Sequence, residues 1–178
     1  MIHLSLTEIN QPQEVDVVFE GRRRFVVAIG NSQTRTLDSA NEEVCYWRMV
    51  GGQNENLLTV DLLRKSGRLF GIEVGVYVGD IARIDKPFSL PGGATCGTPV
   101  FDLSSWRDIL RGPNVVDVRE PFKLVLWHDA LEIVTKPKIS EGTAVELSER
   151  LVCLFDAAKD LSSIVIRGMH SAELNGFA

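Results

Sequence analysis

A strict alternation of apolar and other residues in the middle of the chain constrains its fold more than any other feature. Residues 70–78 read Phe-Gly-Ile-Glu-Val-Gly-Val-Tyr-Val. Because successive side chains of a β-strand point to opposite faces, the pattern predicts a strand with one face in the core. The predicted core residues of this strand are Phe70, Ile72, Val74, Val76 and Val78. Residues 57–63 alternate in the same way, and the turn residues 64–67 complete a predicted hairpin.

Three further pairs of β-prone segments flank short polar turns. The predicted hairpins join residues 15–19 to 25–29, 122–127 to 131–134, and 151–155 to 161–167, and residues 44–49 are another β-prone run. Helical signals are few, and residues 102–110 are the best candidate, with Ser104 or Ser105 as the N-cap. We therefore predict a mainly β fold, in which antiparallel hairpins form one or two packed sheets with one or two short helices. An α+β fold with more helix is the alternative.

The length of 178 residues fits a single domain spanning 1–178. Segment 87–99 holds three prolines and three glycines, residues that break regular structure. This Pro/Gly-rich loop either joins two parts, 1–86 and 100–178, or carries the chain from one β-layer to another.

The two halves of the chain also share four identical apolar residues at an offset of 92 positions. The pairs are Val60/Val152, Leu62/Leu154, Leu69/Leu161 and Ile72/Ile164. They are the apolar positions of two predicted hairpins, where β patterning alone produces identical residues. Internal duplication and coincident patterning both account for the pairs.

The charge of the chain disfavours nucleic acid as a partner. The formal net charge is −5 and the sequence pI is near 5.2, so the chain repels phosphate backbones. The basic run 22–24 is short, and we interpret it as a solvated hairpin tip. No apolar run approaches the roughly 18 residues that cross a bilayer, and no signal-peptide pattern is seen. We expect a cytoplasmic protein without a membrane partner.

The cysteines supply the one catalytic hypothesis. Cys45, Cys96 and Cys153 are far apart and odd in number, which predicts neither a disulfide framework nor a zinc site and suits a reducing compartment. Cys96 lies in a Gly-rich loop, where a thiolate nucleophile with His128 or His170 as its base would make a small enzyme. A ligand-binding domain built on the same loop is part of this alternative. We predict no metal site and no cofactor, because no metal-ligand spacing or phosphate-binding glycine motif is present.

Residues 67–74 read Gly-Arg-Leu-Phe-Gly-Ile-Glu-Val, which resembles the second strand of hairpins in small bacterial β-domains. The acidic, β-rich and motif-poor chain as a whole resembles the immunity proteins that neutralise toxins in bacterial contact-dependent inhibition. This resemblance implies a non-catalytic protein that binds a protein partner, such as a basic toxin, and it assigns no role to any single residue. An acidic surface would attract such a partner electrostatically.

Overall fold

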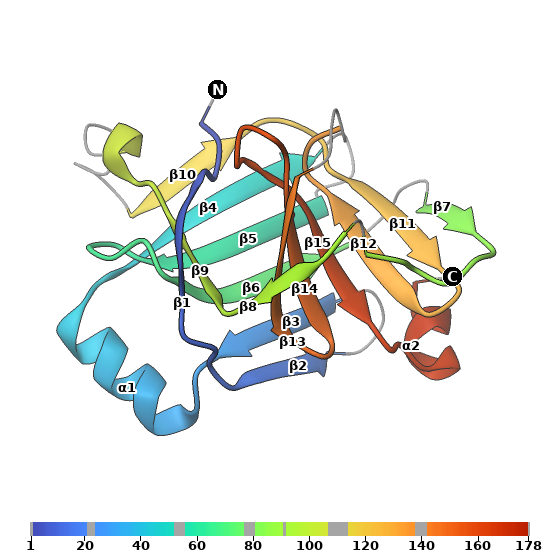
Figure 1. Cartoon of the computed structure of the whole chain (residues 1–178), viewed down its shortest axis with the longest axis horizontal. Helices are drawn as coiled ribbons and strands as arrows, with labels where there is room; N and C mark the ends of the chain where they lie inside the picture. The colour runs from blue at the N-terminus through green and yellow to red at the C-terminus, as the bar shows by residue number, and fades with distance from the viewer. Residues whose placement is uncertain are drawn as a thin grey trace.

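The computed structural model describes residues 2–20, 24–51, 56–76, 81–90, 92–106, 114–137 and 142–177. Within these residues the strands form two large sheets and a two-stranded ribbon (Figure 1). The strands of the N-terminal sheet are β2 (Val15–Phe19), β3 (Arg24–Ile29), β4 (Val44–Gly51), β5 (Asn56–Leu63), β6 (Leu69–Gly75) and β10 (Val115–Val118). Their order across the sheet is β10-β4-β5-β6-β3-β2.

The C-terminal sheet has seven strands in the order β7-β11-β12-β15-β14-β13-β8. They are β7 (Ile81–Ile84), β8 (Ala94–Cys96), β11 (Lys123–Trp127), β12 (Ala130–Val134), β13 (Thr143–Ser148), β14 (Leu151–Phe155) and β15 (Leu161–Arg167). The ribbon pairs β1 (Leu6–Asn10) with β9 (Thr98–Phe101) in antiparallel orientation. All four predicted hairpins are present, and the prediction of a mainly β fold is confirmed.

The described helices are short: α1 (Ser32–Asn41), α2 (Ser171–Asn175) and a 3₁₀ turn at Ser104–Trp106. The 3₁₀ turn is the start of the helix predicted over 102–110, whose last four residues lie outside the described residues. Helix α1 was not predicted. None of the helices among the described residues is long and apolar enough to cross a membrane.

The main hydrophobic core lies between the two sheets. Phe25, Val60 and Ile72 of the N-terminal sheet and Leu131 and Ile164 of the C-terminal sheet are each no more than 1% exposed and belong to one apolar cluster. Each sheet buries one face against the other, which is the arrangement of a β-sandwich.

Ile72, Val74 and Val76 of the predicted core face belong to the main core cluster, whereas Phe70 is buried but lies outside that cluster. Opposite β5, the pairing shifts register between Asp61 and Leu62, so that Leu69 rather than Phe70 occupies the core position. Such a bulge adds one residue to a strand and thereby reverses the face of the residues beyond it. The Phe70 ring instead lies under the Arg35 guanidinium of α1, 4.1 Å from its carbon to the ring centroid. Val78 lies outside the described residues.

The two sheets repeat one topology. In chain order, β2 to β6 run β4-β5-β6-β3-β2 across the N-terminal sheet, and β11 to β15 run β13-β14-β15-β12-β11 across the C-terminal sheet. Every pairing within these sets is antiparallel. The bulge is repeated too, since β14 shifts register between Leu154 and Phe155 opposite β15. Ile72 and Ile164 therefore occupy equivalent positions, and so do Leu69 and Leu161.

The two other identical pairs are displaced by one residue. Val60 pairs with Ile72, whereas Cys153, not Val152, pairs with Ile164. The displacement follows from the number of residues between the last paired positions, which is six between Leu62 and Leu69 and five between Phe155 and Leu161.

The ribbon joins the two repeats at these turns. The N–H of Phe101 on β9 donates to the carbonyl of Gly67 over 2.9 Å, and the N–H of Leu6 on β1 donates to the carbonyl of Lys159 over 2.8 Å. Gly67 and Lys159 are 92 positions apart, and both have positive φ, 71° and 65°. Leu6 and Phe101 are paired in the ribbon, and each of them donates its N–H to the turn of a different repeat.

Each half of the chain also supplies an edge strand to the sheet of the other half. Strand β7 pairs in parallel with β11, and β10 pairs in parallel with β4. The two sheets are therefore interlocked as well as packed.

The prediction that segment 87–99 is a loop without regular structure is wrong in its second half. Residues 94–96 form β8, parallel to β13, and β9 begins at Thr98. Pro99 is accommodated because its strand is paired on β1 in a two-stranded ribbon, where a missing N–H can face away from the partner.

A matched pair of substitutions tests the repeated turn. A Cβ at Gly67 would lie 2.1 Å from the carbonyl oxygen of Phe101, in a backbone that also requires positive φ. We expect Gly67→Ala to lower the free energy of unfolding by about 2–4 kcal/mol, because the ribbon must move. Lys159 at the equivalent position already carries a Cβ. We therefore expect Lys159→Ala to change the free energy of unfolding by less than about 1 kcal/mol. Urea unfolding measures both, and a Gly67→Ala variant that is as stable as the Lys159→Ala variant would contradict the expected clash.

Candidate functional site

The structure separates the residues of the catalytic hypothesis. Cys96 is exposed on β8, at one edge of the C-terminal sheet. His128 lies in the turn between β11 and β12, at least four strand spacings away, or about 19 Å. His170 lies beside that same turn, because the N–H of Met169 donates to the Asp129 carbonyl. Neither histidine is placed to act as a base for Cys96.

The other two cysteines are buried thiols. Burial raises the pKa of Cys45 to about 11 and that of Cys153 to about 12. Such thiols stay protonated at neutral pH and are poor nucleophiles. Among the described residues, no group of three or more His, Cys, Asp or Glu side chains is arranged to hold a metal ion.

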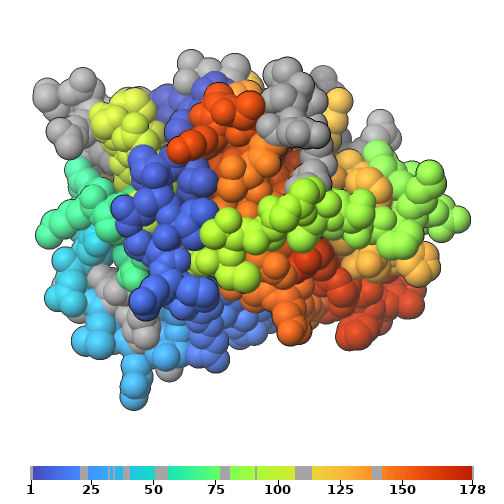
Figure 2. Space-filling view, in the orientation of Figure 1, coloured from blue at the N-terminus to red at the C-terminus, as the bar shows by residue number. Residues whose placement is uncertain are grey.

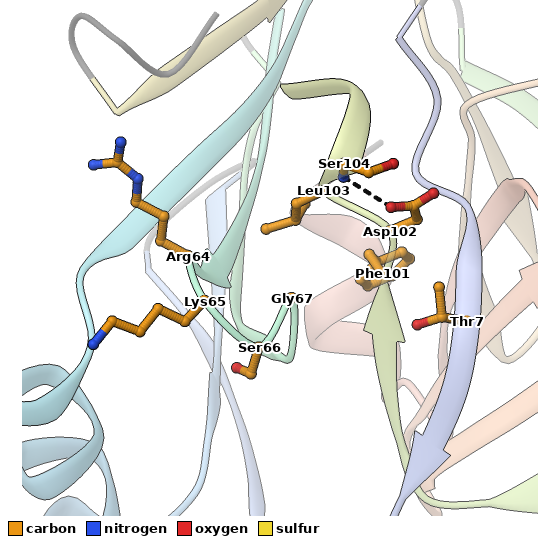
Figure 3. Close-up of a pocket in the computed structure, with 9 residues that line it drawn as sticks. All are labelled: Thr7, Arg64, Lys65, Ser66, Gly67, Phe101, Asp102, Leu103 and Ser104. Carbon is orange, nitrogen blue, oxygen red and sulfur yellow. Dashed lines mark hydrogen bonds between the residues drawn. The ribbon is translucent and has the colours of Figure 1, made fainter. Parts of the chain in front are cut away.

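A cavity of about 490 Å³ opens where the turn between β5 and β6 meets the ribbon (Figure 3). Its cationic side chains, Arg64 and Lys65, point away from Asp102 and Thr7 in this view. Arg64 donates to Glu43 over 2.7 Å and to Asn114 over 3.0 Å.

The backbone donors of this turn are also engaged. The N–H groups of Lys65 and Ser66 both donate to the Glu42 carboxylate. The turn therefore already holds an anionic group from its own chain, and we do not assign the cavity to a ligand.

The outer face of the C-terminal sheet is covered by the chain itself. Phe88 and Leu90 pack on a second apolar cluster on that face, and Phe88 meets Trp127 edge-on with ring centroids 5.5 Å apart. The Asp129 carboxylate accepts a hydrogen bond from the Phe88 N–H over 2.8 Å. In Figure 2 the segment that carries Phe88 and Leu90 crosses the orange and red strands as a green band. Segment 87–90 thus lies across this face, and we call it the strap.

The outer face of the N-terminal sheet is different, and we name it the open face. It carries the side chains of alternate residues whose neighbours fill the core: Asp16, Val18, Arg24, Val26, Tyr46, Arg48, Val50, Thr59, Asp61, Glu73 and Asp117. Among the described residues, the large apolar side chains that are exposed are Val18 (44%), Tyr46 (37%) and Val50 (40%) on this face, and Leu37 on α1. Tyr46 and Val50 lie on β4, and Val18 lies four strand positions away on β2.

The charges of the open face are mostly paired within it. Arg24 contacts Glu73 at 2.7 Å, and Arg48 contacts Asp117 at 2.8 Å. Neither Asp16 nor Asp61 forms an ion pair with another described residue. Since both arginines are matched by a carboxylate, the remaining charge of this face is negative.

Asp61 is the unusual residue of the open face. It lies between Tyr46 and Gly71 on neighbouring strands, and a Cβ at Gly71 would come within 3.1 Å of its Oδ2. Its Oδ1 is buried and accepts no hydrogen bond from any described residue. Burial, with a smaller contribution from Glu73, raises the pKa of Asp61 to about 6, and the Arg35 charge opposes this. The fold thus keeps a carboxylate where its charged form is poorly stabilised.

No protein-family model matches the chain, and no curated protein matches its sequence. The open face was not predicted as a site. The alternation in residues 57–63 and 70–76 does indicate which residues face outward, but the register that places Asp61 beside Tyr46 and Gly71 comes from pairing between strands.

Replacing Asp61 by Asn should stabilise the protein. The folded-state pKa is raised from 3.8 to about 6, so the native state binds the proton more tightly and loses stability as pH rises through this window. We expect Asp61→Asn to raise the free energy of unfolding at pH 7 by about 1–2 kcal/mol, less than the full shift because the site is partly solvated. At pH 3.5 the difference should largely vanish.

The control is Asp117→Asn on the same face, which removes a paired carboxylate and should not stabilise. Denaturant unfolding of both variants at the two pH values checks the expectation. An Asp61→Asn variant that is no more stable than wild type at pH 7 would contradict it.

Proposed function

We propose that the protein is a non-catalytic binding protein that docks a basic protein partner on the open face, as an immunity protein that neutralises a basic toxin would do. The observation that carries the proposal is that three exposed apolar side chains share the open face with Asp61, whose Oδ1 accepts no hydrogen bond from a described residue. The strap covers the corresponding face of the C-terminal sheet, whereas Val18, Tyr46 and Val50 of the open face are exposed.

The chemistry of the face suits a cationic side chain of the partner. Tyr46 lies directly across from Asp61, and tyrosine is among the residues that most often anchor protein interfaces. A lysine or arginine of the partner that lies beside Tyr46 would supply a positive charge to pair with the Asp61 carboxylate. Val18 and Val50 would be buried by the same contact, and the long-range field would speed association.

The rival function, a small enzyme or ligand-binding domain built around Cys96, has less support. Its thiol lies at an exposed sheet edge, and both histidines lie near the turn between β11 and β12. The Gly-rich loop that was to hold a ligand is used instead by β8, β9 and the strap.

A site-specific cross-linking experiment tests the proposal. A photo-reactive amino acid replaces Tyr46 in cells that produce the protein, and a second sample carries it at Glu149, an exposed residue in the turn between β13 and β14. We expect a discrete cross-linked protein of basic pI from position 46 only. The association rate of the purified pair should fall at least tenfold between low and high salt.

Two charge reversals sharpen the result. Asp61→Lys should weaken binding at least a hundredfold, whereas Asp85→Lys, an exposed change of the same charge outside the open face, should have little effect. The proposal fails if position 46 captures no protein, if the captured protein is neutral or acidic, or if the two reversals weaken binding equally.

A further inference from the structure

Strand β2 is an edge strand of the open face, and no strand among the described residues pairs with its outer side. Its inner side is paired with β3. The bonds at the two ends of this pairing are Gly30 N–H to Glu14 carbonyl, 2.7 Å, and Glu20 N–H to Arg24 carbonyl, 2.9 Å. Because hydrogen-bonded pairs alternate along an antiparallel ladder, Asp16 and Val18 also bond to β3.

The backbone groups of the intervening residues therefore point outward. Val15, Val17 and Phe19 pair with β3 at the non-bonded positions, so their N–H and carbonyl groups face the free edge. Their side chains pack on the main core, which holds the edge in place. A row of outward donors and acceptors on a fixed strand is a template for an added strand.

In the other repeat, the equivalent edge is paired with an additional strand. Strand β11 is equivalent to β2, because each opens its repeat with a hairpin, and β7 is laid against its outer side in parallel. Chain from the first half thus completes the second sheet. Nothing among the described residues does this for β2, so the equivalent position beside it is available to another molecule.

The charges around β2 select the occupant. Glu14 and Asp16 are exposed, and neither has an ion-pair partner among the described residues. A second copy of the chain that paired antiparallel about Val17 would bring Glu14 and Asp16 of both copies to one seam, with Glu14 opposite Glu20, which is itself paired with Arg24. Like charges across a strand pair are destabilising, whereas lysines or arginines there would be attracted.

We propose that the free edge of β2 takes up an extended, lysine- or arginine-rich segment of a partner protein as an added strand. The inference rests on the proposed function for the class of partner, and it adds the mode of recognition. Backbone hydrogen bonds to Val15, Val17 and Phe19 would supply affinity. The acidic side chains beside them would supply the preference for a basic segment, and Val18 would contact its apolar residues.

Amide hydrogen exchange with synthetic peptides tests the edge directly. The probe is an eight-residue peptide of alternating lysine and valine, with blocked ends. One control peptide has glutamate in place of lysine, and another is the lysine peptide with N-methylated valines, which keeps the charge but cannot complete the ladder. In the free protein, the amides of Val15, Val17 and Phe19 should exchange fast and those of Asp16 and Val18 slowly. The lysine peptide should slow the outward amides at least tenfold, and neither control should.

Variants of the protein provide a second measurement. Val17→Pro removes an outward N–H that β3 does not use, which edge strands tolerate, and it should abolish uptake of the peptide. Asp16→Lys keeps every backbone group and should weaken uptake at least tenfold. Slow exchange at β3 and an unchanged melting temperature would show that the variants remain folded.

Three outcomes would overturn the inference: binding of the lysine peptide without slower exchange at the three outward amides, equal binding of the glutamate peptide, or protection in the free protein that grows with its concentration, which would make a second copy the occupant. The proposed function is tested separately. A partner that cross-links at position 46 and is lost with Asp61→Lys, yet is indifferent to Val17→Pro, contradicts the edge alone. Uptake at the edge without any cross-link at position 46 contradicts docking on the open face alone.

Discussion

The apolar contact between the inner faces of the two sheets is the interaction on which the rest of the molecule depends. Each sheet has two faces, and this contact buries one of each. It leaves two outer faces, and the chain treats them differently. The strap closes one with Phe88 and Leu90, whereas the other keeps Tyr46 and Val50 exposed. Since the two sheets have the same topology, the difference comes from the connecting segments rather than from the sheets.

The connecting segments also decide which sheet edges are closed. Strands β7, β8 and β10 are short and lie parallel to their neighbours, each brought in from outside the five-stranded unit that it borders. Short edge strands protect a sheet against unwanted pairing. Strand β2 is the exception among the described edges, and it borders the open face. The open face and the free edge of β2 are therefore adjacent.

Local patterns could be predicted from the sequence, and contacts between distant segments could not. The hairpins were found because their alternation and turns are local properties of the chain. The position of Phe70 outside the main core cluster could not be predicted, because it depends on a bulge of one residue opposite β5. Helix α1 was missed because its sequence, Ser-Gln-Thr-Arg-Thr-Leu-Asp-Ser-Ala-Asn, has almost no apolar stripe, and Arg35 anchors it through the carbonyls of Ile29 and Phe70.

The candidate site could not be predicted either, because it too depends on contacts between distant segments. The acidity of the chain pointed to a binding surface, but it is a sum over all residues and has no position. Cys96 and His128 were joined only by their chemistry, and the strand order places them far apart. The parallel pairing of the edge strands has no local sequence signal, because the two paired strands lie dozens of residues apart in the sequence.

Two other carboxylates that are partly removed from solvent have lowered pKa values, in contrast to Asp61. Burial alone would raise the pKa of Asp156 and Asp160, yet hydrogen bonds from Lys136, Ser5 and backbone N–H groups hold both pKa values below the ordinary one. Lys136 reaches the two carboxylates at 2.8 and 2.9 Å, and its own pKa is raised by these bonds. These acids stabilise the turn between β14 and β15, and that stability is lost only as pH falls through their lowered pKa values.

Asp61 lies in the equivalent sheet without any such support. Arg35, whose charge lowers the pKa of Asp61, directs its guanidinium to backbone carbonyls and to the Phe70 ring. Lys136 and the other donors thus offset the burial of Asp156 and Asp160, whereas Asp61 on the open face keeps a raised pKa. A cost to stability that the fold itself could have avoided is expected where a residue acts on another molecule, because the missing charge is then supplied on binding.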